Sequence, residues 1–222
     1  METTQSIEET RNHVEAWKQQ QLRVGFVPTM GFLHEGHLAL VRRAKETCDR
    51  VVVSIFVNPT QFSPGEDLDS YPRDEAGDLK KLMEEGVDLV FLPTVETLYP
   101  KGEETYVNLT KLPNHLCGLQ RPGHFQGVAT VCTKLFNIVA PHEAIFGAKD
   151  FQQVQVLKKM VRDLCLHLDI VTVETKREAD GLAMSSRNAY LTQDERRNAP
   201  VLYRSLTRTR EQVANGQRDA QS

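Results

Sequence analysis

The sequence lacks long apolar runs, a basic N-terminal leader and any excess of positive charge. Its longest apolar stretch, residues 51–57, is far shorter than the roughly 20 residues of a membrane-spanning helix, so no span is expected. The first nine residues are polar and acidic, which argues against a signal peptide. The 27 Lys and Arg residues against 30 Asp and Glu residues give a net charge of −3, which disfavours nucleic-acid binding.

Cysteine is scarce and shows no metal or redox spacing. The four cysteines stand at positions 48, 117, 132 and 165 and form no CxxC pair. We interpret them as reduced thiols of a cytoplasmic protein. The 222 residues, 40% of them apolar, suffice for a sizeable core in one large domain or two modest ones.

Short apolar runs that alternate with helical patterns predict the fold class. The runs cover residues 23–28, 50–57, 87–93, 143–147 and 168–173 and are rich in β-branched and aromatic residues, as is typical of strands buried on both faces. Apolar residues at helical spacing lie between them, and the most apolar such helix, over 125–139, stops before Pro141. Strand–helix alternation predicts an α/β, doubly wound (Rossmann-like) parallel sheet.

The pattern changes after the last apolar run. Residues 1–175 are expected to form the sheet domain, and a polar, turn-rich stretch follows it. Two amphipathic helices are predicted near 192–198 and 201–214, and the chain then ends in polar residues with no closing core element. We therefore expect residues 176–222 to form a small, apparently truncated C-terminal lid domain.

A histidine pair follows the first predicted strand, in the segment from Pro28 to His37. Ligands of α/β sheets bind at the carboxyl ends of strands, and helix N-termini attract phosphate. His34 and His37 are three residues apart and project from one side of a helical turn, while Gly36 removes a Cβ between them. The pair favours phosphate binding. Solvated loop histidines remain an alternative, and a metal site is disfavoured because the spacing differs from HExxH.

Uncharged and basic polar groups follow the other strands. Asn58 and Gln61 come after the second strand and suit a hydroxylated small molecule, although an Asn-Pro turn with a solvated glutamine is an equal alternative. Arg121 and His124 precede the most apolar helix, where they either contact an anion or belong to an ordinary capping loop.

Two later segments carry further candidate phosphate ligands. Gly147, Lys149 and Asp150 join the fourth strand to its helix. Gly147 permits a close approach of a ligand to the backbone, and Lys149 suits a phosphate. Asp150 suits a ribose contact or a helix cap. The string Met184-Ser185-Ser186-Arg187 offers hydroxyls and a guanidinium to a triphosphate. Either string alone is compatible with a plain capped helix or a surface loop.

In order and spacing, these motifs are similar to those of a known family. The string HEGH at 34–37 resembles the HIGH-type signature of nucleotidylyltransferases and class I aminoacyl-tRNA synthetases, and MSSR at 184–187 resembles their KMSKS-type loop. The longer segment 28–37, together with 54–62, 69–74, 147–153 and 177–188, resembles the pantothenate synthetase (pantoate–β-alanine ligase) family in particular.

The resemblance implies an ATP-dependent, AMP-forming ligase. Pantoate would attack ATP to give pantoyl adenylate and pyrophosphate, and β-alanine would then displace AMP to give pantothenate. It further implies Mg²⁺ bound with ATP, a homodimer, and no nucleic-acid or membrane partner. The family's C-terminal domain usually extends further than this chain does. The acidic residues Asp74, Glu75 and Asp78 leave the identity of any metal-binding carboxylate open.

The resemblance also assigns roles to individual residues. His34 and His37 are expected to stabilise the transition state, with His37 as the proton donor. Pantoate contacts are expected from Asn58, Gln61 and Gln153, with Gln61 also meeting β-alanine, and Arg121 and His124 are candidate anion contacts. The expected ATP contacts are Met30, Gly31, Phe32, Leu33, His34, Glu35, Gly36, His37, Gly147, Ala148, Lys149, Asp150, Val173, Met184, Ser185, Ser186 and Arg187.

Two other functions fit the same motifs. Another nucleotidylyltransferase with an HxGH site would act on a phosphorylated acceptor and keep a nucleotide-linked product. A chain with a short lid would instead bind ATP and pantoate without turnover.

Overall fold

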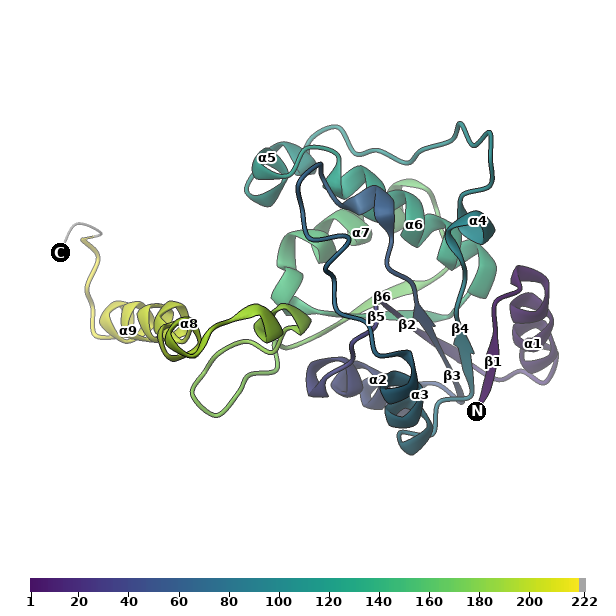
Figure 1. Cartoon of the computed structure of the whole chain (residues 1–222), viewed down its shortest axis with the longest axis horizontal. Coiled ribbons are helices and arrows are strands. Elements are labelled where there is room, and N and C mark those ends of the chain that lie inside the picture. The colour runs from purple at the N-terminus through teal and green to yellow at the C-terminus, as the bar shows by residue number, and fades with distance from the viewer. Residues whose placement is uncertain (220–222) are drawn as a thin grey trace.

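The computed structural model of the chain describes residues 1–219 and contains one parallel sheet with helices on both faces (Figure 1). Its strands are β1 (Glu2–Thr4), β2 (Val24–Thr29), β3 (Arg50–Ile55), β4 (Leu89–Phe91), β5 (Glu143–Gly147) and β6 (Asp169–Val173). They lie in the order β1-β4-β3-β2-β5-β6, and every pair is parallel. The predicted doubly wound α/β class is confirmed. The edge strand β1 was not predicted, because three polar residues carry no apolar signal.

Side chains that alternate between the two faces of the sheet build two hydrophobic cores. Phe26 and Val52 pack in one core with α6 (His124–Val139), α7 (Phe151–Asp163) and α1 (Ile7–Gln19). Val27 and Val53, one residue further along each strand, pack in the other core with α2 (Glu35–Thr47) and α3 (Glu75–Glu84). Successive side chains point to opposite faces of a strand, so a continuous apolar run supplies both layers.

The direction of winding reverses next to β2. The chain moves outward from β2 through β3 to β4 and then crosses to β5, on the other side of β2. The connections that follow β2 and β5 therefore run to opposite faces of the sheet: β2 leads into α2 and β5 leads into α7. Such a switch point opens a crevice at the carboxyl ends of the two strands.

The chain beyond β6 leaves the sheet. Helices α8 (Gln193–Asn198) and α9 (Val201–Ala214) extend away from the main body (Figure 1), at the positions expected from the sequence. The shorter elements are α4 (Val95–Leu98), α5 (Cys117–Gln120) and the 3₁₀ turns η1 (Pro59–Gln61), η2 (Leu112–Asn114), η3 (Ala148–Asp150) and η4 (Ser186–Tyr190). The end of β6 at Val173 lies close to the predicted boundary near 175, while the lid role of residues 176–222 remains a prediction.

All four cysteines are free thiols, with Cys48 and Cys132 buried and Cys117 and Cys165 exposed. Within residues 1–219, no helix is both long and apolar enough to cross a membrane.

One glycine allows the turn after β3 to pack on α6. A Cβ on Gly127, the fourth residue of α6, would lie 2.3 Å from the carbonyl oxygen of Thr60 and 2.7 Å from the backbone nitrogen of Gln61. Real Cβ atoms do not approach backbone this closely. The absence of a side chain at Gly127 thus sets the position of η1 and of Gln61.

Replacing Gly127 with alanine is expected to push η1 away from α6. We predict that Gly127→Ala lowers the free energy of unfolding by about 1–3 kcal/mol, because overpacking outweighs the better helix propensity of alanine. Urea denaturation measures this change. The matched control, Asn137→Ala on the exposed side of the same helix, should change stability by less than about 0.5 kcal/mol. Equal stabilities for Gly127→Ala and the wild type would contradict the packing argument.

Candidate active site

A cleft that opens to solvent lies at the switch point. The ends of β2 and β5 form its floor, and α2, η1, α6, α7 and the segment 174–187 form its walls. The structure brings together in its lining the sequence-predicted residues Met30, His34, Gly36, His37, Asn58, Gln61, Gly147, Lys149, Asp150, Gln153, Met184, Ser185, Ser186 and Arg187.

Other predicted residues lie outside the lining of this cleft: Gly31, Phe32, Leu33, Glu35, Ala148, Val173, Arg121 and His124. Most are neighbours in sequence of lining residues. Glu35 forms an ion pair with Arg42 on the surface of α2, so its carboxylate is engaged elsewhere.

The loop between β2 and α2 is clamped by a buried carboxylate. Asp78 of α3, 1% exposed, accepts the backbone N–H groups of Phe32 (2.7 Å) and Leu33 (2.6 Å). Lys81 donates to the carbonyl of Leu33 at 2.8 Å. The loop requires this support because Gly31 and Phe32 both adopt positive φ angles, +81° and +51°, which are unfavourable for a residue such as phenylalanine.

These contacts bear on the acidic residues of α3. Burial raises the pKa of Asp78, and the two N–H groups of Leu33 and Phe32 oppose that rise. Asp74 caps α3 by accepting the N–H of Gly77 at 3.0 Å. Asp78 therefore supports the active-site loop and Asp74 supports its own helix, and neither lines the cleft.

The two histidines cap α2 reciprocally. His34 Nδ1 accepts the N–H of Gly36 (3.1 Å), and His37 Nδ1 accepts the N–H of His34 (3.3 Å). The rings lie 4.1 Å apart between centroids. A Cβ on Gly36 would lie 2.8 Å from His34 Cε1, so glycine at this position permits the cap.

The cap determines which ring nitrogen carries a proton. Each Nδ1 accepts a hydrogen bond, so in the neutral rings the proton sits on Nε2. Desolvation lowers the pKa of His37 to about 3, and the charges of His34, Lys149 and Lys81 contribute to this lowering. Desolvation, then Lys149 and Lys81, also lower the pKa of His34. Near pH 7 the pair therefore presents two neutral Nε2–H donors at a helix N-terminus, a suitable arrangement for phosphate oxygens.

An amide network lies on the opposite wall. Asn58 is 1% exposed and donates through Nδ2 to Gln61 Oε1 at 3.1 Å. Gln61 Nε2 is 3.1 Å from Met30 Sδ. Gln153, from α7, lines the same cleft. This wall offers hydrogen bonds without charge.

Arg121 and His124 support this wall from behind. Arg121 forms a two-pronged ion pair with Glu66, at 2.6 and 2.7 Å. His124 Nδ1 lies 2.8 Å from the carbonyl oxygen of Gln61, and its Nε2 lies 3.1 Å from Arg121. In this structure both side chains are engaged with protein groups outside the cleft, so the expectation of an anion contact finds no support in their placement.

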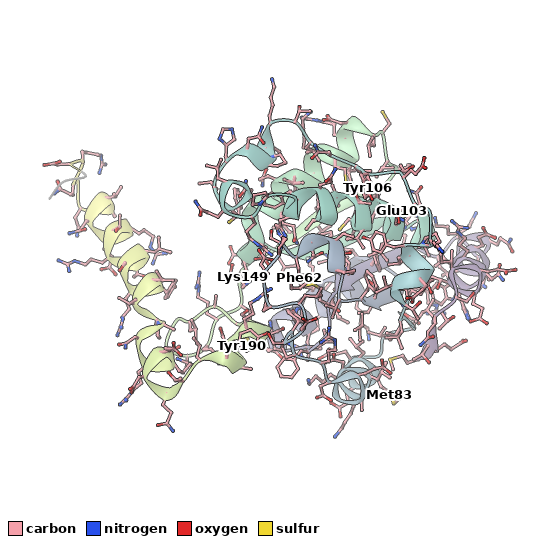
Figure 2. The ribbon with its side chains drawn as sticks, turned by 45° about the horizontal axis from the view of Figure 1, so that its top comes forward. Phe62, Met83, Glu103, Tyr106, Lys149 and Tyr190 are labelled. Atoms are coloured by element: carbon pink, nitrogen blue, oxygen red, sulfur yellow. The ribbon has the colours of Figure 1, made fainter. Side chains whose placement is uncertain are left out.

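Cationic groups line the remaining side. Lys149 Nζ is 3.1 Å from Asp150; the residue lies in η3, just before α7, and lines the cleft, and Figure 2 labels its side chain. Arg187 donates through Nε and Nη2 to Asp67, both at 2.8 Å. Ser186 Oγ donates to the carbonyl of Phe32 at 3.1 Å, which docks the segment 184–187 against the β2–α2 loop.

A second contact reinforces this docking. The hydroxyl oxygen of Tyr190, which comes from the C-terminal segment (Figure 2), lies 3.1 Å from Asp67 Oδ2 and 3.1 Å from the carbonyl oxygen of Ser70, so its one proton is shared between these two acceptors. The Arg187 guanidinium lies 5.2 Å from the ring centroid of Tyr71. Residues 184–190 are thus anchored to the loop that follows η1.

Sequence reasoning missed several lining residues: Tyr71, Cys132, Glu174, Thr175 and Lys176. Cys132 lies on α6 among apolar residues, and the spacing of apolar residues does not distinguish a helix face that packs in the core from one that lines a cleft. Lys176 follows β6, the last strand of the sheet. Other lining residues also follow strands, and this shared position is the signal that could have identified Lys176.

The chain matches a known family over nearly its whole length. The model of the family described as pantoate-beta-alanine ligase matches residues 2–222. A pantothenate synthetase of Desulfatibacillum aliphaticivorans is 58% identical over 206 residues, 93% of this chain and 73% of the relative. One of Thermotoga petrophila is 55% identical over 221 residues, 100% of this chain and 79% of the relative.

Solved structures show the same similarity. Pantothenate synthetase of Thermus thermophilus superposes with a TM-score of 0.93 at 52% identity, covering 97% of this chain and 77% of that one. Pantoate-beta-alanine ligase of Francisella tularensis, complexed with beta-gamma ATP and beta-alanine, superposes with a TM-score of 0.87 at 38% identity, covering 92% of this chain and 78% of that one.

The low pKa of His37 predicts how the stability of the fold depends on pH. Its folded pKa, about 3, is below the unfolded value near 6.5, so the unfolded chain takes up the proton first as pH falls. The stabilising contribution of the neutral ring is present above pH 6.5 and is lost as pH falls towards 3. The glutamine of a His37→Gln variant keeps an acceptor and does not titrate.

We therefore expect the wild type to lose about 1–2 kcal/mol more stability than His37→Gln between pH 7 and pH 5. Denaturant titrations at the two pH values measure the difference. The control is His167→Gln. His167 is exposed and lies just before the amino end of β6, the end of the strand away from the cleft, so this variant should lose as much stability as the wild type. Parallel losses in His37→Gln and the wild type would show that His37 has no depressed pKa.

Proposed function

This chain belongs to the pantoate-beta-alanine ligase family, and we propose that its cleft joins pantoate to β-alanine through pantoyl adenylate. The carboxylate of pantoate attacks the α-phosphorus of ATP, and pyrophosphate leaves. The amine of β-alanine then attacks the acyl carbon, AMP leaves, and pantothenate forms. The observation that carries the proposal is the histidine pair at the switch point, whose Nδ1 atoms are occupied by the helix cap, in the same cleft as the uncharged amides of Gln61 and Gln153.

The first step places growing negative charge on phosphate oxygens. His34 and His37 stabilise that charge by hydrogen bonding from Nε2, in a position fixed before the substrate arrives. The low pKa of His37 keeps its ring neutral near pH 7, and the Nε2–H of a neutral imidazole is too weak an acid to transfer its proton. The role proposed for His37 is therefore hydrogen-bond donation, in place of the proton transfer expected from the resemblance.

The rest of the nucleotide lies across the cleft. Lys149, Ser185 and Arg187 are proposed to hold the phosphates; the Asp67 fork uses Nε and Nη2 of Arg187, which leaves Nη1 for this contact. Nothing lies within 4 Å of a Cβ placed on Gly147, so the backbone there has open space for adenosine, with Asp150 beside it as a ribose acceptor.

Pantoate, the small acid, is proposed to bind against the wall of uncharged amides. Gln61 and Gln153 are proposed to bind the hydroxyl and carboxylate groups of pantoate, and Gln61 also to contact β-alanine. Asn58 has its amide engaged by protein groups, so it supports Gln61 and is not proposed as a direct ligand. An uncharged wall suits a non-phosphorylated acid better than the phosphorylated acceptor of other nucleotidylyltransferases.

Neither step requires a protein nucleophile. Burial raises the pKa of Cys132, the thiol that lines the cleft, to about 12, so it stays protonated and unreactive. Catalysis rests on the position of the two substrates and on charge stabilisation.

Mg²⁺ is proposed to arrive with ATP. The carboxylates that line the cleft are Asp150 and Glu174, and residues 1–219 contain no cluster of three or more His, Cys, Asp or Glu side chains able to hold a metal. This donor set fits Mg²⁺ held chiefly by phosphate oxygens and water, with at most one or two carboxylates. The ion would neutralise phosphate charge.

Three broader features are proposed from the family and the chain's chemistry. Residues 176–222 act as a lid whose segment 184–187 covers the triphosphate. Two copies form a homodimer. The enzyme works in the cytoplasm, a reducing compartment that suits four free thiols.

The function is tested by removing one histidine donor. We expect His37→Ala to reduce pantoate-dependent pyrophosphate release by about 100- to 1000-fold, the usual cost of one transition-state hydrogen bond, while the circular dichroism spectrum stays native. His167→Ala is the matched control, since residue 167 lies before the amino end of β6 and should leave the rate unchanged.

Two outcomes would contradict the proposal, each in a different way. Near wild-type pyrophosphate release by His37→Ala would remove the role of His37. A wild-type chain that binds ATP and pantoate by calorimetry, yet forms no AMP after β-alanine is added, would show a binding protein without turnover.

A further inference from the structure

We propose that Tyr99 is a positioning residue for the pantoate site: its hydroxyl helps to hold the Asn58 amide in its present orientation, and that amide in turn fixes the orientation of Gln61. The inference rests on the proposed function, because Gln61 is assigned to pantoate there. Tyr99 is the C-cap of α4 and is absent from the cleft lining, so any effect on the substrate must pass through other residues.

The contacts of Asn58 define its orientation. Its Oδ1 accepts from the hydroxyl of Tyr99 at 2.8 Å and from Thr60 Oγ1 at 3.0 Å. Its Nδ2 donates to Gln61 Oε1 at 3.1 Å and to the carbonyl of Gly127 at 3.3 Å. If the amide were rotated by 180°, Nδ2 would face the backbone N–H of Thr60, which now donates to Oδ1 at 3.4 Å, and the carbonyl oxygen of Gly127 would face another oxygen. The Tyr99 and Thr60 hydroxyls can also accept, so their part is to stabilise the present orientation by donating to Oδ1. A buried amide tolerates such mismatches poorly.

The orientation of Asn58 passes to Gln61. Because Gln61 Oε1 is occupied by the Asn58 amide, the amino group Nε2 is the end directed towards Met30 and the cleft. An amino group donates hydrogen bonds to the carboxylate and hydroxyl oxygens of a small acid. The reverse orientation would set a carbonyl oxygen against a carboxylate, which is repulsive.

The Tyr99 ring is itself held in place. It packs 6.2 Å from the ring of Phe56 between centroids, and Lys134 Nζ lies 4.6 Å from its centroid. Lys134 is paired at 2.8 Å with Glu103, labelled in Figure 2. Burial also raises the pKa of Tyr99 to about 12, so the hydroxyl keeps its proton and remains a donor over the working pH range.

Tyr99→Phe tests the proposal because it removes the hydroxyl and keeps the ring. We expect the KM for pantoate to rise about tenfold, the equivalent of one hydrogen bond, with the KM for ATP and kcat at saturating pantoate within about twofold of wild type. Tyr106→Phe, at an exposed tyrosine, is the matched control and should change none of these values. Thr60→Val, which removes the other hydroxyl on Asn58 Oδ1, should raise the same KM and serves if Tyr99→Phe does not fold.

A double-mutant cycle then asks whether Tyr99 acts through Gln61. In a Gln61→Ala background, adding Tyr99→Phe should leave the pantoate KM unchanged. Additive effects, an unchanged pantoate KM in the single variant, or equal rises for ATP and pantoate would each overturn the inference. Absence of pantoate-dependent AMP formation by the wild type would overturn the proposed function instead, so the two failures are distinguishable.

Discussion

The reciprocal capping of α2 by His34 and His37 is the constraint on which the site depends. Two hydrogen bonds to Nδ1 atoms complete the N-terminus of the helix and leave each Nε2 protonated. The same two residues therefore end the loop after β2, begin the helix and supply the donors. Structure and chemistry are coupled here, because a change that breaks the cap also misplaces the donors.

The surroundings of the cap keep it in this state. Asp78 holds the N–H groups of Phe32 and Leu33, so the loop keeps its positive φ angles. Burial disfavours a proton on either imidazole, and the charges of Lys149 and Lys81 add to this effect. The cleft thus has a cationic side, which suits phosphates, and an uncharged side, which suits a small acid. A few local cations suffice for this, which is consistent with a chain of net charge −3.

Sequence reasoning reached the sheet, the location of the site at the carboxyl ends of strands and about half of the lining residues, because those signals are local. Apolar runs mark the strands, and polar residues at strand ends mark the cleft. It missed β1 because Glu2–Thr4 is too short and polar for periodicity to show. It could not find hydrogen-bond partners that are distant in the sequence, such as Asp67 for Arg187 or Tyr99 for Asn58. It left Arg121 open between an anion contact and a capping loop and could not find its partner Glu66, because an ion pair between distant residues leaves no local pattern.

The protonation of the two imidazoles is the most direct test of this account. Nitrogen NMR of uniformly labelled protein, with ring signals assigned by His34→Gln and His37→Gln, reports which ring nitrogen carries a proton. The account predicts neutral rings protonated at Nε2 for both residues at pH 7, with His37 still neutral at pH 5. An imidazolium at pH 7, or a proton on Nδ1 of either ring, would contradict it.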